Sequence, residues 1–312
     1  MGIIATILVV AGALALAFYN VLSRIFQRDD WRNRSALVSV ATSVGSAIML
    51  LGYSLVTGGP SMSAGWLFPV LATGILNIGI MFAKMRARAL EDVSLVTPID
   101  STTPVVVIFT AMIIVGEFPT RLGWVGIWVL VLGTYVLNIQ ELRQQLAERD
   151  RAVGSRWWRE LRVWLAPFLA LRKSAGVRWA FFAVALSTIS LNYDGLTARR
   201  TDVGFGFGLV YAIVALGNAT VAVVRQEHRG ATWEGFSLRM VILGLPLAVG
   251  TILTGLAFQL SLVAYVGTMK RVVIPLTIIL AYFVLKERGF FRQRIVGGII
   301  MAVGAALVAL GG

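Results

Sequence analysis

The sequence predicts an all-α membrane protein with ten transmembrane helices in two inverted five-helix repeats. Three observations predict this fold: the apolar composition, ten apolar stretches of membrane-spanning length, and a motif that recurs in both halves. Of the 312 residues, 58% are hydrophobic and 14% are charged, and the mean hydropathy is +0.82. A typical soluble domain has about 25% charged residues, so the composition favours an integral membrane protein.

The ten apolar stretches are each long enough to cross the ~30 Å hydrocarbon core as an α-helix. Those of the first half are residues 2–23, 35–56, 65–83, 93–115 and 122–139. Those of the second half are residues 178–197, 203–224, 239–264, 267–285 and 295–310. Most connections are short, which favours antiparallel neighbours. The first stretch lacks a charged leader region and a cleavage site, so we expect it to be retained as a helix.

One connection is long, because residues 141–177 separate a first repeat, residues 1–140, from a second repeat, residues 178–312. This connection is basic and rich in tryptophan. Four apolar side chains recur in it at helical spacing with arginines between them: Trp157, Leu161, Trp164 and Phe168. The pattern predicts a helix on the membrane surface. We interpret it as an anchor that joins the repeats, with a lipid sensor or regulatory latch as the alternative.

The two halves share a motif. Gly116-Glu117 closes the fourth stretch and Lys286-Glu287 closes the ninth. Beyond each pair stand two glycines seven residues apart: Gly126 and Gly133, and Gly297 and Gly304. Pro104 and Pro275 also match, with a slip of one residue. Since each half has an odd number of spans, the second half enters the membrane from the opposite side, and such inverted repeats are typical of secondary transporters.

The distribution of cations predicts an orientation. The loops on one side carry 4, 3, 9, 3 and 4 Lys and Arg residues, whereas the other side carries Arg121, Arg199 and Arg200 outside the spans. Under the positive-inside rule, both termini then lie outside the cytoplasm of a bacterial inner membrane. The formal net charge of +13 comes mainly from these loops, so we expect no nucleic-acid partner.

Several kinds of site are excluded by residue content. The chain has no cysteine and a single histidine, His228, which argues against disulfides, thiolate metal sites and multi-histidine centres. It has no G-x-x-x-x-G-K-[ST] loop and no plausible nucleophile–base–acid set. We therefore expect no enzyme, no cofactor and no metal site.

Lys270 and Arg271 stand inside the ninth apolar stretch, about one helical turn from its predicted boundary. A charged side chain at the bilayer centre costs roughly 2.5–3.5 kcal/mol on insertion scales. Charged residues in such places usually face a cavity rather than lipid. The pair therefore marks a candidate substrate site.

The repeat gives this cation pair an acidic counterpart. Asp100 precedes Glu117 by seventeen residues, and Lys270 precedes Glu287 by the same interval. Asp100 lies with Thr97 in the most polar part of the fourth stretch. Our hypothesis is that the cations bind an anionic group while Asp100 sets their charge or binds a proton. The alternative is an ion pair that locks two helices, with one cation reaching the interface.

Three further polar residues are candidates. Tyr193 and Asp194 lie late in the sixth stretch, where an acid is a site candidate and a tyrosine can hydrogen-bond a hydroxylated ligand. Asp194 could instead pair with Arg199 near the membrane boundary. Tyr265 lies at the end of the eighth stretch. Most such groups form helix–helix hydrogen bonds, and one or two are expected to line the cavity.

The order and spacing of short motifs resemble those of a known family. The run Leu90-x-x-x-Ser94-Leu95-Val96-x-Pro98, followed by Thr103-Pro104 and Gly116-Glu117, resembles the fourth and fifth helices of the EamA-like branch of the drug/metabolite transporter superfamily. Lys286-Glu287-Arg288, followed by Gly297, Gly304 and Ala305, is similar to the ninth and tenth. The resemblance covers essentially the whole chain. It implies ten helices around a central cavity and transport by alternating access.

A second resemblance concerns the ninth helix. The run Thr268-Met269-Lys270-Arg271-Val272-Val273 resembles that of triose-phosphate and nucleotide-sugar transporters of the same superfamily. It implies that Lys270 and Arg271 hold a phosphate group of the substrate. The usual topology of the superfamily puts both termini in the cytoplasm, opposite to the charge count. The two indications disagree, and the charge count is slightly favoured.

We expect a secondary transporter of a small polar, anionic metabolite, either phosphorylated or carboxylated. The expected substrate-binding residues are Lys270, Arg271, Asp100, Tyr193, Asp194, Thr97 and Tyr265. The expected partners are this small-molecule substrate, the lipid bilayer and a proton or counter-substrate, in a monomer or homodimer. Two alternatives stay open: an exporter of amino acids or amphipathic drugs, and a lipid flippase or non-transporting accessory subunit.

Overall fold

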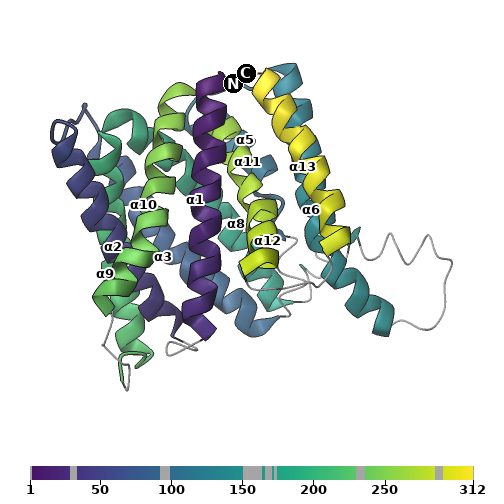
Figure 1. The fold of residues 1–312 in the computed structure, drawn as a ribbon. Coiled ribbons are helices and arrows are strands. Elements are labelled where there is room, and N and C mark those ends of the chain that lie inside the picture. The colour runs from purple at the N-terminus through teal and green to yellow at the C-terminus, as the bar shows by residue number, and fades with distance from the viewer. Residues whose placement is uncertain are drawn as a thin grey trace.

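The computed structural model describes residues 2–28, 34–91, 99–149, 164–165, 171, 174–229, 236–284 and 291–311. Nearly all of these residues are helical. The helices stand side by side, and both chain termini lie at one end of the bundle (Figure 1). We call this the termini end. The opposite end is the basic end, because the loops there carry most of the cations.

The first half of the chain forms five described helices. They are α1 (Ile3–Arg28), α2 (Ser35–Val56), α3 (Leu67–Leu90), α5 (Thr103–Ile114) and α6 (Arg121–Arg149). Long apolar runs adopt this structure in lipid because a helix satisfies its backbone hydrogen bonds internally. Residues 92–98, at the start of the predicted fourth span, lie outside the described part of the chain.

The second half also begins with a long helix and ends with one. Its helices are α8 (Ala175–Arg200), α9 (Val203–Val224), α10 (Phe236–Leu260), α11 (Val263–Met269), the 3₁₀ turn η2 (Lys270–Val272), α12 (Val273–Val284) and α13 (Phe291–Gly311). Local side chains set two of the starts. Ser174 Oγ accepts a hydrogen bond from the Val177 N–H at 3.2 Å, and Asp202 Oδ2 accepts one from the Phe205 N–H at 2.8 Å.

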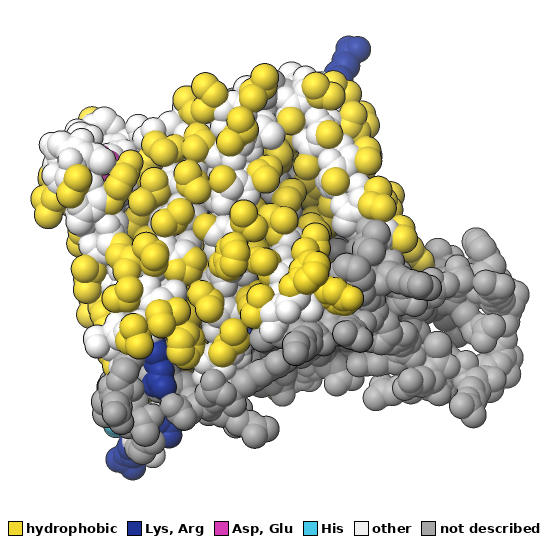
Figure 2. All heavy atoms as spheres, viewed as in Figure 1, with side chains coloured by type: hydrophobic (Ala, Val, Ile, Leu, Met, Phe, Trp, Pro, Cys, Tyr) yellow, Lys and Arg dark blue, Asp and Glu magenta, His cyan; other side chains and the backbone are white. Residues whose placement is uncertain are grey.

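The described residues contain ten apolar helical segments, as the sequence predicts. Seven are long and apolar enough to cross a membrane, counting α11, η2 and α12 as one segment, and three are shorter. Hydrophobic side chains cover most of the described face in Figure 2, while Lys and Arg gather mainly at the basic end. The protein is therefore an integral membrane protein.

The boundary between the eighth and ninth helices differs from the prediction. The predicted eighth span ran to residue 264, but α10 ends at Leu260 and α11 begins at Val263. Leu262 has an extended backbone conformation between them, with φ −63° and ψ 141°. Lys270 therefore lies seven residues into the ninth helix, or about 10 Å at 1.5 Å per residue, rather than one turn.

The long basic connection is only partly described. Helix α6 continues to Arg149, past the predicted end of the fifth span at residue 139. Beyond it, Trp164 and Leu165 are described, and the Trp164 carbonyl accepts a hydrogen bond from the Tyr135 hydroxyl. The predicted surface helix with Trp157, Leu161 and Phe168 lies outside the described residues.

Helices from the two halves pack mainly against each other. The principal contacts are α6 with α13, α2 with α9, α3 with α8, and α1 and α2 with α10. Figure 1 shows α2 and α9 at one edge of the bundle and α6 and α13 at the other. The core between them includes Leu50, Ile108 and Phe258. The interior of the bundle is thus built at the junction of the halves.

The recurring glycines mark the α6–α13 seam. A Cβ atom on Gly126 would overlap the backbone of Val308, and one on Gly304 would overlap the backbone of Leu130. A Cβ atom on Gly133 would overlap the backbone nitrogen of Met301. Small residues let two membrane helices approach closely, so the motif common to both halves serves helix packing.

This packing predicts an effect of added volume on stability. We expect Gly304→Ala to destabilise the protein by about 1–3 kcal/mol, because α6 must move away from α13. Gly298→Ala, on the same helix, is the matched control, since its Cβ would meet only Pro275 at 3.5 Å. Thermal unfolding in detergent measures the difference. Equal melting temperatures of the two variants would contradict the packing role.

Candidate functional site

A cavity of about 400 Å³ lies at the junction of the two halves. Its walls come from α1, α2, α3, α8, α9, α10 and η2. Its polar lining includes Lys84, Asp194, Tyr211, Asn218, Thr251 and Lys270. The volume lies within the usual range of small-molecule sites.

Lys270 is placed in the cavity by the interruption of the ninth helix. It begins the 3₁₀ turn η2 between α11 and α12. Its Nζ lies 5.9 Å from the centroid of the Phe258 ring, within range of a cation–π contact. Within the described part of the chain, this ammonium group has no hydrogen-bond or ion-pair partner. A cation in this position is available to an anionic ligand.

Asp194 lines the same cavity and attracts Lys270 electrostatically. Its carboxylate is held at the α3–α8 seam, where Thr73 Oγ1 donates to Asp194 Oδ1 at 2.5 Å. The Thr73 and Ser190 hydroxyls are 2.8 Å apart, and Asn77 Nδ2 donates to Ser190 Oγ at 3.2 Å. This network of uncharged groups fixes the position of the Asp194 carboxyl group through Thr73.

The cavity extends toward the basic end. Asn218 Nδ2 donates to Ser39 Oγ at 2.6 Å, and Ser39 is four residues from the start of α2. Lys84, near the end of α3, lies 3.7 Å from Asp100 Oδ1. Nearer the middle of the bundle, the Tyr211 hydroxyl and Thr251 Oγ1 are 3.1 Å apart. Neutral hydrogen-bonding groups and one further cation, Lys84, thus continue the lining away from Lys270.

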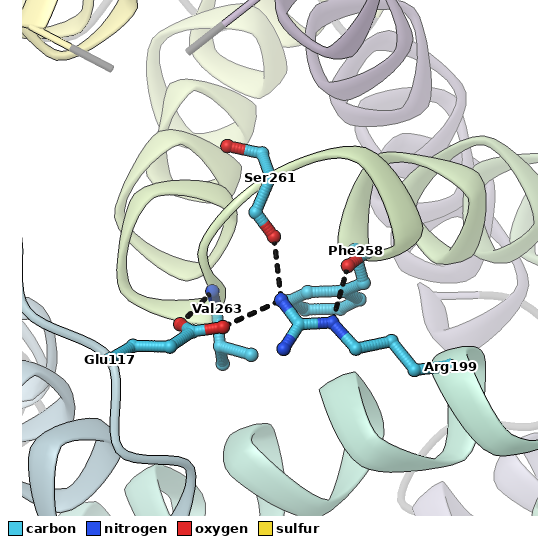
Figure 3. Close-up of polar contacts among 5 residues, drawn as sticks. All are labelled: Glu117, Arg199, Phe258, Ser261 and Val263. Atoms are coloured by element: carbon cyan, nitrogen blue, oxygen red, sulfur yellow. Dashed lines mark hydrogen bonds and ion pairs between the residues drawn. The ribbon is translucent and has the colours of Figure 1, made fainter.

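An ion pair at the termini end links separate segments of the chain (Figure 3). Glu117 Oε1 lies 2.6 Å from an Arg199 guanidinium nitrogen, and Glu117 Oε2 accepts a hydrogen bond from the Val263 N–H at 2.6 Å. Arg199 also donates to the Phe258 carbonyl at 2.9 Å and to the Ser261 carbonyl at 2.8 Å. The two side chains therefore hold the turn between α10 and α11.

Other contacts reinforce this end. The Tyr265 hydroxyl accepts a hydrogen bond from the Thr120 N–H at 2.8 Å, and Thr120 Oγ1 also donates to the Gly311 carbonyl. The Asp202 N–H donates to the Ser61 carbonyl at 2.8 Å. Segments from both halves are joined here.

The ninth helix changes its surroundings along its length. All seven residues of α11 are buried, whereas Thr277 and Ala281 are the buried residues in α12. Helix α11 contacts α5, α6, α8, α10 and α13, while α12 packs mainly against α1. The helix is thus central at the termini end and peripheral toward the basic end.

A family model matches the first half of this fold. Residues 3–139 match the EamA-like transporter family. The match covers α1, α2, α3, α5 and most of α6, and it supports the resemblance to the drug/metabolite transporter superfamily. Members of the family are transporters rather than enzymes, so the match supports a membrane transporter.

The whole fold is shared with a solved structure described only as "Crystal structure of protein". The superposition covers 96% of this chain and 98% of that chain, with a TM-score of 0.68 and 15% sequence identity. At this identity the likeness shows the fold alone. A comparison with curated proteins finds no match.

The predicted site residues lie in different surroundings. Lys270 and Asp194 line the cavity. Arg271 is attracted to Asp100, which itself lies beside Lys84. The Tyr193 ring packs edge-on against Phe68 at 5.4 Å, and Tyr265 is buried in the closure of the termini end. Thr97 lies outside the described residues.

Sequence reasoning missed Thr73 and Ser190, the residues that fix Asp194. A local signal was present, because Thr73 and Asn77 on α3, and Ser190 and Asp194 on α8, are each four residues apart. Such pairs share one helix face. Lys84, in the second half of α3, also lines the cavity.

The Asp194 network predicts a stability effect. Thr73→Val keeps the side-chain shape but removes the hydrogen bond to Asp194, so we expect a loss of about 1–3 kcal/mol. Thr220→Val is the control, since that hydroxyl bonds only the carbonyl of its own helix at Leu216 and is exposed. Thermal unfolding in detergent distinguishes them. A loss no larger than that of the control would refute the network's role.

Proposed function

We propose that the protein is a secondary active transporter that moves a small anionic metabolite, phosphorylated or carboxylated, by alternating access. The observation that carries the proposal is the ammonium group of Lys270, which faces the cavity without a hydrogen-bond or ion-pair partner among the described residues. A charge that is shielded from bulk water attracts an anion much more strongly than it does in solution.

The rest of the cavity supports a solute with hydroxyl groups. Tyr211, Thr251 and Asn77 offer uncharged donors and acceptors beside the charged residues. A phosphorylated or carboxylated compound with a polar body would use both kinds of contact. Asp194, rather than Asp100, is the acid best placed to respond to it, because Asp194 shares the cavity with Lys270.

Helix lengths and contacts support two inverted repeats. Helices α1 and α8 each have 26 residues, and α2 and α9 each have 22. When the halves are exchanged, the contact of α3 with α8 maps onto that of α10 with α1. Likewise, α2 with α10 maps onto α9 with α3, and α1 with α12 maps onto α8 with α5. Inverted repeats provide two alternative closures around one site.

The present conformation supports an inward-facing state. The cavity reaches the basic end, and the termini end is closed by Glu117, Arg199 and Tyr265. If the charge count gives the orientation, the basic end faces the cytoplasm of a bacterial inner membrane. A proton or a counter-substrate would supply the driving force.

A second candidate is an exporter of amino acids. It is favoured by Asp194, whose carboxyl group lies in the same cavity as the ammonium group of Lys270. A zwitterion could contact both charges, whereas a simple anion would use only the lysine. Binding of a carboxylate with and without an amino group separates the two candidates.

Loss of the Lys270 charge should weaken substrate binding strongly. Charge-assisted hydrogen bonds contribute about 1.5–3 kcal/mol, so Lys270→Ala should weaken binding roughly 10–100-fold. The measurement is counterflow in proteoliposomes with a panel of phosphorylated compounds, carboxylates and amino acids. Arg225→Ala is the control, because Arg225 pairs with Glu227 and lies outside the cavity lining. Undiminished flux in the Lys270 variant would remove the anion site from the proposal.

A further inference from the structure

We infer that Glu117 and Arg199 form a gate: their ion pair closes the cavity at the termini end and must break for the cavity to open there. The inference rests on the proposed alternating access. It assigns a task to two residues that lie outside the cavity lining. The pair joins the segment after α5, through Glu117, to the last turn of α8, through Arg199.

The gate holds a turn whose backbone needs partners. Glu117 is 8% exposed and accepts from the first N–H of α11, where a negative charge also meets the positive end of the helix dipole. Arg199 binds the Phe258 and Ser261 carbonyls, where a positive charge meets the negative end of α10. The closed arrangement satisfies both helix ends at once. Separation of the turn from α5 and α8 would remove all these contacts together.

The gate is physically continuous with the cavity through Phe258. The carbonyl of this residue accepts a hydrogen bond from Arg199, while its ring lines the cavity and lies 5.9 Å from the Lys270 ammonium. An anion that draws Lys270 away from the ring changes the surroundings of the same residue that Arg199 holds. Occupancy of the cavity can therefore influence the gate without a long-range relay.

The chain contains a matched control for the gate. Glu227 is also 8% exposed, and its carboxylate accepts from the first N–H groups of a helix, those of Ala36 and Leu37 in α2. It also pairs with an arginine, since Arg225 lies 3.8 Å away. Glu227 stands at the basic end. Glu117→Gln and Glu227→Gln thus remove the same charge from similar surroundings at opposite ends of the bundle.

The test measures access to the cavity from each side of the membrane. The chain has no cysteine, so Ile80→Cys, at a partly exposed cavity position near the middle of α3, introduces the only thiol. A membrane-impermeant maleimide is applied to either face of vesicles of defined orientation. With the gate intact, we expect fast labelling from the basic side and slow labelling from the termini side.

Glu117→Gln should raise the labelling rate from the termini side roughly tenfold or more. Removal of one member of a buried ion pair destabilises the closed state relative to the state that is open at the termini end. The rate from the basic side should fall. Glu227→Gln should leave the rate from the termini side unchanged. The glutamine can still accept from the Val263 N–H, which limits the damage to folding.

A second set of variants separates a gate from a general loosening of the fold. Arg199→Gln should open the termini side as Glu117→Gln does, and the double variant should add little to either, because one ion pair is lost in all three. Thermal unfolding is recorded for each variant. Folded Glu117→Gln and Arg199→Gln proteins with unchanged labelling from the termini side would overturn the gate.

Failure of the gate and failure of the proposed function give different results. The labelling experiment needs no substrate, so it tests the gate even if Lys270 binds no anion. Equal labelling rates from both sides in the Ile80→Cys protein, with Glu117 and Arg199 unchanged, would overturn the closure directly. Normal counterflow in Lys270→Ala, with opening in Glu117→Gln, would remove the anion site and support the gate.

Discussion

Backbone N–H and C=O groups at a helix break need hydrogen-bond partners, and the turn between α10 and α11 finds its partners on the segment after α5 and on α8. Glu117 satisfies the Val263 N–H, and Arg199 satisfies the Phe258 and Ser261 carbonyls. The two side chains also neutralise each other. Without this arrangement, a break at Ser261 would leave three polar backbone groups unpaired. The ion pair therefore stabilises the start of the ninth helix at Val263.

The start of the ninth helix in turn sets the depth of the candidate site. A start at Val263 puts Lys270 about 10 Å along the helix, at the 3₁₀ turn that joins α11 to α12. Helix α11 is enclosed by other helices, so the turn opens on the cavity rather than on lipid. A cation at this depth is tolerated because it faces a polar cavity and an acid, Asp194.

The sequence predicted what depends on composition and on local spacing. The ten apolar stretches and the recurring glycines are local features, and the helices and their packing agree with them. Contacts between distant segments were beyond this reasoning. The turn before Val263 contains no proline or glycine that would signal it in the sequence. Its hydrogen-bond partners, Glu117 and Arg199, are distant along the chain. Asp194 is fixed by Thr73, 121 residues away, so only the fold reveals its role.

The repeat relates Asp100 to Lys270 by position, yet the two residues have different surroundings. Asp100 lies beside Lys84 and attracts Arg271, whereas Lys270 faces the cavity and attracts Asp194. If the two halves form the proposed inverted repeats, the charges are distributed unequally between them. A substrate would therefore meet its main cation on the second half. Lys270 also contacts the ring of Phe258, and the carbonyl of the same residue accepts a hydrogen bond from Arg199. Phe258 therefore contacts both the proposed binding residue and the proposed gate.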